Sequence, residues 1–243
     1  MSKFEPKEEE SKTVFGKRCS LKSPKPETLG VSLDTRNKSE GIAFLKKLPD
    51  KSIPCAFFDP QYRGVLDAMN YGNEGERQKG RAQLKQMTEE IIKDFIVELN
   101  RVLVPSGHLF LWVDKFHLLQ GIQGWLVNTD LELVDHIVWN KMRMGMGYRT
   151  RRISEHLIVL QKSPKKAKGV WCLHTIPDVW EEKIEDKTHC HSKPLKLQAK
   201  LIEAVTRRGD VVLDPAAGSF SVMESAHLVG RKFVGCDLEV TRC

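Results

Sequence analysis

Several signatures of common protein classes are absent from this 243-residue chain. No apolar run approaches the roughly 18 residues of a membrane-spanning helix, and the Lys/Glu-rich start lacks the apolar core of a secretory signal. The six cysteines form no Cys-x-x-Cys pair, a scatter that favours reduced thiols in a cytoplasmic protein. Neither a Gly-x-Gly-x-x-Gly fingerprint nor a Gly-Lys-Ser/Thr phosphate loop is present, which disfavours NAD and a phosphate-binding loop.

The charge is distributed unevenly over a composition that is otherwise ordinary. Hydrophobic residues make up 40% of the chain and charged residues 29%, as in a globular protein of one or two domains. Residues 141–168 hold nine Lys or Arg and one acid, Glu155, so the net charge of this segment is +8. The whole chain has a net charge of +7, and the residues outside the segment therefore sum to −1. Such a cluster suits a polyphosphate partner, although a solvated basic loop has the same composition.

Helical and strand-like patterns alternate along the chain, which predicts an α/β fold with a largely parallel sheet. Buried strands are expected at 53–58, 109–113, 133–139, 157–161, 211–213 and 232–236. The polar residues 1–28 predict a flexible N-terminal tail, followed by a single domain over residues 29–243. Residues 63–87 are basic and too long for an ordinary connection, so they are a candidate loop or lid.

An acid follows the first of these strands. Residues 53–58 are uncharged and predict a buried strand, after which the chain continues as Asp59-Pro60-Gln61-Tyr62. Open parallel sheets bind their ligands at the carboxyl ends of the strands, so Asp59 is a candidate site residue. This acid, the nearby main-chain carbonyls and the flat ring of Tyr62 would suit a planar ligand that carries an amino group. A plain turn after a strand is the alternative.

A second motif lies near the C-terminus. The strand at 211–213 leads into the small-residue loop 214–219 and then into a predicted helix, so a ligand could approach the backbone and the helix N-terminus. Asp237 ends the next strand, 23 residues after Asp214, where an acid can accept hydrogen bonds from both hydroxyls of a ribose. The pattern favours a nucleoside cofactor without a pyrophosphate over a turn that binds nothing.

Together the two motifs resemble those of the amino-group DNA methyltransferases that use S-adenosylmethionine. Asp59-Pro60-Gln61-Tyr62 resembles the catalytic Asp-Pro-Pro-Tyr motif, and Asp214 to Ser219 resembles the cofactor loop. Their permuted order is similar to that of the β group, and the resemblance covers residues 32–239. It implies a Rossmann-like methyltransferase fold with a mostly parallel seven-stranded sheet flanked by helices, and a short target-recognition insert around residues 142–190.

The resemblance also implies roles for individual residues. Asp59 and the carbonyl of Pro60 would accept hydrogen bonds from the exocyclic amine of a flipped-out base, on which Tyr62 would stack. The implied residues for S-adenosylmethionine are Glu40, Asp59, Lys193, Asp214, Ala216, Gly218, Ser219, Phe220 and Asp237. Lys193 would hold the methionine carboxylate of the cofactor, unless it is simply an exposed lysine at the start of a helix.

The chain departs from the family pattern at three positions and at its end. Gln61 replaces the second proline of the catalytic motif, Ala216 stands where Phe is usual, and Phe220 where Gly is usual. Phe220 is expected either to replace the missing aromatic against the adenine or to crowd the site. The chain also ends six residues after Asp237, where the family continues into a helix; a truncation, a shorter protein or a compensating tail would each account for this.

The implied reaction is methyl transfer to the N6 amino group of adenine in double-stranded DNA, because an acid opens the motif in adenine enzymes and serine is commoner in cytosine N4 enzymes. Cytosine N4 methylation, a non-catalytic DNA-binding protein on the same fold, and methylation of RNA or of a protein glutamine are the alternatives. The resemblance further implies a protein of a bacterial or phage-infected cell, with a cytoplasmic, nucleoid-associated location. It implies no membrane partner, and a homodimer or a cognate restriction enzyme is compatible with it.

The basic segment is expected to contact the DNA. Arg149, Arg151 and Arg152 are predicted to bind mainly phosphate, with one of them reading guanine. Lys165 and Lys166 are either further phosphate contacts or part of a plain basic loop.

A zinc site is the competing interpretation of another cluster. Cys172, His174 and the His-Cys-His run at 189–191 could together supply four ligands. Their spacing fits no familiar zinc finger, so no metal is expected.

Overall fold

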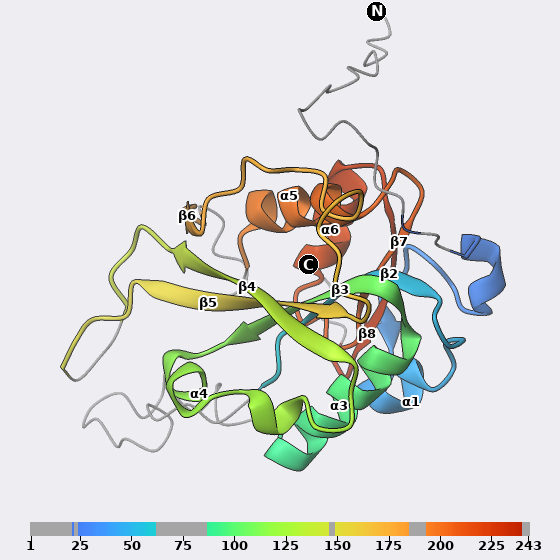
Figure 1. Cartoon of the computed structure of the whole chain (residues 1–243), viewed down its shortest axis with the longest axis horizontal. Coiled ribbons are helices and arrows are strands. Elements are labelled where there is room, and N and C mark those ends of the chain that lie inside the picture. Colours follow the sequence, from blue (N-terminus) through green and yellow to red (C-terminus); the bar gives the residue numbers. More distant parts are fainter. Residues whose placement is uncertain (1–20, 22–23, 62–86, 146–148, 185–192, 240–243) are drawn as a thin grey trace, which may run out of the picture.

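The computed structural model describes residues 21, 24–61, 87–145, 149–184 and 193–239. Its strands are β1 (Asn37–Lys38), β2 (Ile53–Phe58), β3 (Leu103–Val113), β4 (Leu131–Asn140), β5 (Ser154–Lys162), β6 (Val179–Glu181), β7 (Val211–Asp214) and β8 (Lys232–Asp237). In this described part of the chain they form one sheet in the order β1-β8-β7-β2-β3-β5-β4-β6 (Figure 1). Five neighbouring pairs are parallel, and β5 runs antiparallel to both β3 and β4. The predicted α/β fold with a mostly parallel sheet is confirmed, with eight strands instead of seven.

Helices cover both faces of the sheet (Figure 1). They are α1 (Gly41–Leu45), α3 (Glu89–Val102), α4 (Lys115–Gln120), α5 (Leu195–Val205) and α6 (Ser221–Leu228), with short 3-10 helices η1 (Pro26–Leu29) and η4 (Gln123–Trp125). Helices α1 and α3 lie on one face, and α5 and α6 lie together on the other. None of the helices described here is long and apolar enough to cross a lipid bilayer.

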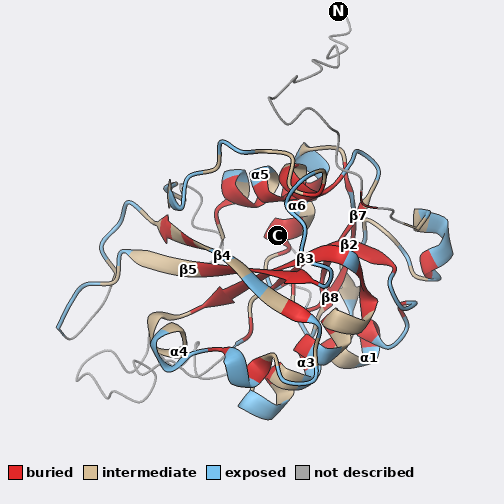
Figure 2. Cartoon of the chain, viewed as in Figure 1, coloured by how far each residue is buried: buried red, intermediate tan, exposed pale blue. Residues whose placement is uncertain are grey.

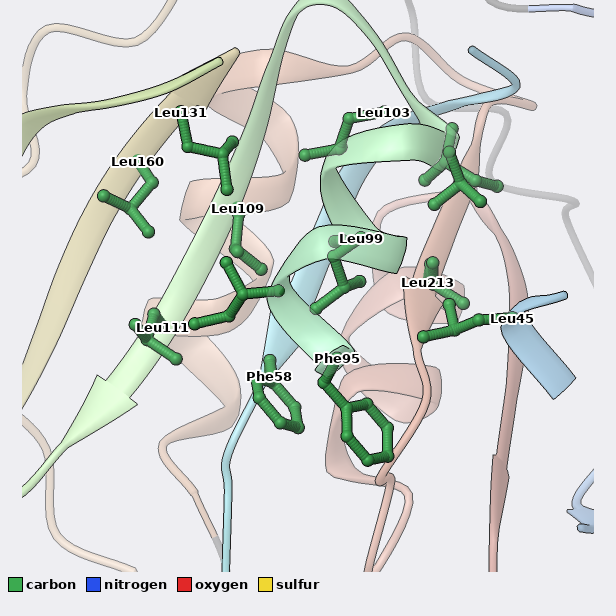
Figure 3. Packing of buried hydrophobic residues seen from close by; sticks show 14 of the residues in the cluster. Leu45, Phe58, Phe95, Leu99, Leu103, Leu109, Leu111, Leu131, Leu160 and Leu213 are labelled. Atoms are coloured by element: carbon green, nitrogen blue, oxygen red, sulfur yellow. The ribbon is translucent and has the colours of Figure 1, made fainter. Parts of the chain in front are cut away.

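Helix α3 follows the rules of helix formation closely. The Thr88 hydroxyl accepts a hydrogen bond from the N–H of Ile91 (3.4 Å), and two glutamates in the first turn suit the positive end of the helix dipole. Its buried face consists of Ile92, Phe95, Ile96, Leu99 and Val102. Phe95 stacks on Phe58, with ring centroids 4.9 Å apart (Figure 3). Burial of such a side chain contributes about 1.5–3 kcal/mol, so α3 anchors the last residue of β2.

Strand β2 is buried on both sides (Figure 2). Ala56 and Phe58 pack in the cluster that includes α1 and α3, whereas Cys55 and Phe57 pack in the cluster that includes α5 and α6. This is the pattern of a central parallel strand between two layers of helices. Because β3 and β7 also hold both edges of the strand, the position of the residue that follows it is fixed by the core.

Ordered structure begins before the predicted domain start at residue 29. Residues 26–29 form η1, whose Leu29 is buried in the core with 2% of its surface exposed. Leu21 packs against Val104 and Val170 in a small cluster of its own. Within the predicted tail, the structure thus describes a contact of Leu21 with the domain and the first residues of η1, and the boundary at residue 29 stays a prediction. Residues 1–20 lie outside the described part of the chain.

A glycine is required at position 235, where β8 pairs with β7 near the carboxyl ends of the two strands. It pairs with Asp214, and a β-carbon there would collide with the Asp214 carbonyl oxygen and the ring of Phe233. We expect Gly235→Ala to lower the free energy of unfolding by about 1–3 kcal/mol, as overpacking does, and the thermal midpoint by about 2–12 °C. Thermal denaturation followed by circular dichroism measures the change.

The matched control is Gly124→Ala, since a β-carbon at Gly124 meets no heavy atom within 4 Å. A thermal midpoint of Gly235→Ala within about 1 °C of the midpoint of Gly124→Ala would contradict the collision. In a domain of this size a loss of 1 kcal/mol lowers the midpoint by roughly 2–4 °C, so a difference below 1 °C is too small for overpacking.

Candidate active site

Asp59 lies at the carboxyl end of β2, between the ends of β3 and β7. Its side chain is 36% exposed, whereas Pro60 is buried. The carbonyl of Gln61 accepts a hydrogen bond from the N–H of Met87 (2.8 Å), so the described residues on either side of the predicted lid are joined to each other. Tyr62 and residues 63–86 of the predicted lid lie outside the described residues.

Asp214 ends β7, the strand next to β2, and is buried. One of its carboxylate oxygens accepts a hydrogen bond from the N–H of Ala216 (3.1 Å). Burial raises the pKa of Asp214 well above its usual range; the hydrogen bond opposes this rise, and the charges of Asp59 and Asp237 add to it. A buried acid among like charges favours a cationic ligand.

Asp237 ends β8 and fixes the loop that follows β7. Its carboxylate accepts hydrogen bonds from the N–H groups of Gly218 (2.8 Å) and Glu239 (3.0 Å). Its own carbonyl accepts a bond from the N–H of Ser39 (3.0 Å), which places Glu40 at the same edge of the sheet. The Glu40 carboxylate caps α1 by accepting bonds from two main-chain N–H groups, at 3.0 and 2.6 Å. The structure thus brings these predicted cofactor residues together, and it shows a structural role for Glu40.

Phe220 is buried instead of lining the loop. Its ring is 1% exposed, packs edge-on against Phe233 with centroids 6.0 Å apart, and lies beneath the guanidinium of Arg36 at 5.4 Å. This packing does not support the prediction that the Phe220 ring touches the cofactor, since the core beneath α5 and α6 already encloses it. Ala216 and Ser219 are half-buried in the same loop.

A lysine bridges two acids beside Asp59. The Lys193 Nζ lies 3.0 Å from Asp59 Oδ2 and 2.9 Å from Glu155 Oε2, and the other oxygen of Glu155 lies 3.2 Å from Lys141 Nζ. The same ammonium sits 4.6 Å from the centre of the Trp112 ring. With a side chain only 15% exposed, Lys193 is not the exposed helix-start lysine that the sequence left open.

Both ends of the Lys193–Glu155 pair stay ionised. Burial alone would raise the pKa of the Glu155 carboxyl, but Lys193 and Lys141 outweigh it and lower that pKa to about 2. Burial would lower the pKa of Lys193, yet Asp59 and Glu155 raise it above its usual range. Sequence reasoning missed Glu155 as a site residue, although it stood out as the one acid of the basic segment 141–168.

Helix α5, which follows Lys193, is held at its first turn by an acid from the insert. The Glu182 carboxylate accepts hydrogen bonds from the N–H groups of Lys196 and Leu197, both at 3.0 Å, and from the indole of Trp180 at 2.8 Å. The Glu182 carbonyl accepts a bond from the Trp139 indole (2.8 Å). A carboxylate at a helix N-terminus stabilises the helix through its free N–H groups and its dipole. The predicted recognition insert therefore also braces α5.

The predicted DNA-contacting arginines lie in the hairpin between β4 and β5. Arg149 and Arg151 are exposed, and the Arg151 side chain donates a hydrogen bond to the Gly145 carbonyl (2.7 Å). The Arg152 guanidinium lies over the ring of Phe116 in α4, at 5.5 Å. Because β5 begins beside the end of β3, this hairpin projects from the same edge of the sheet as Asp59.

Lys165 and Lys166 lie at the opposite edge. They follow the end of β5, which runs antiparallel to β3 and therefore finishes where β3 begins. Lys165 pairs with Glu132 at 3.4 Å, and both main-chain groups of Lys166 bond to the Gln161 side chain. The antiparallel direction of β5 therefore places these two lysines away from Asp59. The sequence pattern predicts the strand but not its direction, so their position could not be predicted.

The described residues contain no group of three or more His, Cys, Asp or Glu placed to hold a metal ion. Cys172 is half-buried with its N–H bonded to the Ala204 carbonyl (2.7 Å), and His174 is exposed. The other zinc candidates, residues 189–191, lie outside the described part of the chain.

A Rossmann-like sheet with acids after β2 and at the ends of β7 and β8 is the arrangement of an α/β protein that binds a nucleoside-containing ligand at the carboxyl ends of its strands. The chain belongs to the N6/N4 DNA methylase family, which it matches over residues 53–243. It is 58% identical over 208 residues to the Type II methyltransferase M.HhaII of Haemophilus parahaemolyticus, a match that spans 85% of this chain and 91% of that protein.

Two solved structures share the fold. The PvuII DNA methyltransferase (cytosine-N4-specific) superposes with a TM-score of 0.63 at 15% identity, over 86% of this chain and 83% of that one. The M1.HpyAVI–SAM complex superposes with a TM-score of 0.60 at 18% identity, over 85% of this chain and 94% of that one.

Membership of the family confirms the resemblance inferred from the two motifs. The protein is a DNA methyltransferase that takes its methyl group from S-adenosylmethionine, and its substrate is DNA. This outcome favours an enzyme over the non-catalytic DNA-binding alternative, and DNA over RNA or a protein glutamine.

The charges at the strand ends fit this cofactor. S-adenosylmethionine carries a sulfonium, an ammonium, a carboxylate and two ribose hydroxyls. The site offers acids at Asp59, Asp214 and Asp237 for the cationic groups and hydroxyls. The structure pairs the Lys193 ammonium with Asp59 and Glu155, and its contact with the cofactor carboxylate stays a prediction. Gly218 leaves open space where a β-carbon would project, so a ligand can approach its backbone.

The raised pKa of Asp214 gives a pH-dependent prediction. Because the folded state holds the Asp214 proton more tightly than the unfolded state, its contribution to stability is complete below about pH 4 and is lost as the pH rises through the folded pKa. We expect Asp214→Asn, which cannot ionise, to melt at a higher temperature than the wild type by about 2–6 °C at pH 8, and by less at pH 5. Thermal denaturation at both pH values measures the two gaps.

Asp178→Asn, at an exposed acid, is the control and should show no widening of the gap. Asp214→Asn should also weaken S-adenosylmethionine binding at pH 8, measured by calorimetry, since it removes the charge of the ionised carboxylate. A gap that narrows from pH 5 to pH 8 would show that Asp214 is not the titrating group.

The Glu182 cap predicts a second effect. Glu182→Ala should destabilise the protein by about 1–2 kcal/mol, because three hydrogen bonds to its carboxylate are lost at the start of α5. Urea unfolding measures the change. The neighbouring Glu181→Ala removes a single bond, from Asn140, at an exposed position and should cost less than about 0.5 kcal/mol. Equal losses in the two variants would argue against the cap.

Proposed function

We propose that this protein is a Type II methyltransferase of a restriction-modification system that methylates adenine at N6. The carrying observation is Asp59, an acid fixed at the end of the central strand β2 beside the cofactor loop of β7. An acid at the start of the motif is the adenine pattern, and M.HhaII is named a Type II methyltransferase. The fold is shared with a cytosine-N4-specific enzyme, so the choice of base rests on Asp59.

The residues support a direct transfer. Asp59 and the Pro60 carbonyl accept hydrogen bonds from the exocyclic amine and draw its lone pair out of conjugation with the ring. The bound cofactor supplies an electrophilic methyl group on a sulfonium sulfur. As the nitrogen–carbon bond forms, the carbon–sulfur bond breaks with its electrons left on sulfur, and the methylated amine then releases one proton to solvent. The enzyme thus acts by positioning the two reactants and excluding water, and Tyr62 stacks on the flipped base.

The hairpin arginines are the proposed DNA contacts. Arg149, Arg151 and Arg152 project from the edge that carries Asp59, so they can reach phosphates on either side of a base that enters the site. Lys115 of α4 reinforces this surface, because its ammonium donates a hydrogen bond to the Thr150 hydroxyl (3.4 Å). Lys165 and Lys166 lie at the edge of the sheet opposite Asp59. They would contact DNA away from the base that enters the site, or no DNA at all.

The test is transfer of a tritiated methyl group from S-adenosylmethionine to unmethylated genomic DNA, followed by nucleoside analysis. We expect the label in N6-methyladenine, and a loss of at least about 10³-fold in kcat for Asp59→Ala, which removes the acceptor for the amine. Asp94→Ala, at an exposed acid of α3, is the control.

Label in N4-methylcytosine would reassign the base while leaving the enzyme class intact. Full activity in Asp59→Ala would contradict the proposed role of this side chain. Binding of S-adenosylmethionine, measured separately, distinguishes a failure of chemistry from a failure to hold the cofactor.

A further inference from the structure

The contact between Lys193 and Asp59 depends on a residue from a third strand. Lys193 precedes α5, Asp59 follows β2, and Glu155 is the second residue of β5. In the sheet β3 lies between β2 and β5, and the ammonium of Lys193 crosses it above the ring of Trp112, at 4.6 Å from the ring centre. It reaches an oxygen of Asp59 at 3.0 Å on one side and an oxygen of Glu155 at 2.9 Å on the other.

We infer that Glu155 is a positioning residue for methyl transfer: it holds the Lys193 ammonium at a fixed place beside Asp59 and so fixes the Asp59 carboxylate. The inference rests on the proposed transfer to an exocyclic amine, and it holds whether that amine belongs to adenine or to cytosine.

The flexibility of the lysine side chain is the first reason that Lys193 needs Glu155 as a second carboxylate partner. A lysine side chain loses more rotamer freedom than most when it is fixed, so one contact with a partly exposed carboxylate is a weak restraint. Lys193 instead has two carboxylates and an aromatic face on different sides of its ammonium. Three contacts in different directions restrain the position of the charge as one contact does not.

Charge balance is the second reason. Asp59, Glu155, Lys193 and Lys141 form a chain of alternating charges that sums to zero, with the outer oxygen of Glu155 paired to Lys141 at 3.2 Å. Without the Glu155 charge, this group carries +1 next to the place where a sulfonium must bind and where positive charge develops on the amine. Lys193 would then have Asp59 as its sole carboxylate partner among these four groups, and the ammonium would compete with the substrate amine for that carboxylate.

The experiment is a double-mutant cycle in the full-length enzyme. Glu155→Gln, Lys193→Met and the double variant are compared with the wild type by kcat and by the KM for S-adenosylmethionine, with total tritium in DNA as the signal. We expect Glu155→Gln to lower kcat by about 10–100-fold, as misplacement of a reacting group does, and to change this KM by less than about threefold. In the Lys193→Met background, Glu155→Gln should cause no further loss, because Glu155 acts through Lys193.

The matched control is Glu132→Gln, which breaks another glutamate–lysine pair of the sheet, with Lys165 at 3.4 Å, at the edge opposite Asp59. It should leave kcat unchanged. Equal losses from Glu155→Gln in the wild-type and Lys193→Met backgrounds would overturn the inference, as would an unchanged kcat in the single variant. A purely structural role would lower the thermal midpoint and would not depend on which residue occupies position 193.

A second measurement does not depend on activity. A crystal structure of Glu155→Gln should show the Lys193 ammonium displaced from its place over the Trp112 ring and the Asp59 carboxylate rotated. An ammonium left within hydrogen-bond distance of Asp59 and above Trp112 would overturn the inference. Label found in cytosine would change the proposed base alone, because both the cycle and the structure report on Glu155 whatever base is methylated.

Discussion

Parallel pairing brings the carboxyl ends of three strands together, and each of these strands ends in or next to an acid. Asp59, Asp214 and Asp237 come from β2, β7 and β8, neighbours in the sheet although Asp59 and Asp214 are 155 positions apart in the chain. The same geometry that builds a site for a sulfonium also sets like charges against one another, which shows in the raised pKa of Asp214. The arrangement requires a cation at the strand ends, and Lys193 supplies it against Asp59.

The position of that lysine explains why residues far from the strand ends matter. Lys193 enters α5 through Pro194, and α5 is packed in the core on Leu197, Leu201 and Ile202. Its first turn is capped by Glu182, a residue of the segment between β5 and α5 that was predicted to serve DNA recognition. Part of that insert therefore places a charge in the active site, and changes to it would affect catalysis through α5 without touching DNA.

The strand-end acids could be predicted from the sequence because they depend on local pattern: an uncharged run marks a buried strand, and the residue after it must lie at the sheet edge. The contacts of Lys193, Lys165 and Phe220 could not, because they depend on which strands are neighbours and on the direction of β5. Glu155 lies between these cases. A lone acid in a strongly basic segment is visible in the sequence, but only the antiparallel pairing of β5 with β3 carries it to the edge where Asp59 lies.

The direction of β5 also decides how the basic segment 141–168 can act. Read along the chain it is one cluster of positive charge, yet the sheet divides it. The arginines that precede β5 lie at the edge that holds Asp59, and the lysines that follow β5 lie at the other edge, one of them paired with Glu132. A base that enters beside Asp59 brings its flanking phosphates to the first group. The electrostatic attraction of the second group acts at longer range and is screened within about 8–10 Å at physiological salt, so it can favour encounter with DNA without fixing the base in the site.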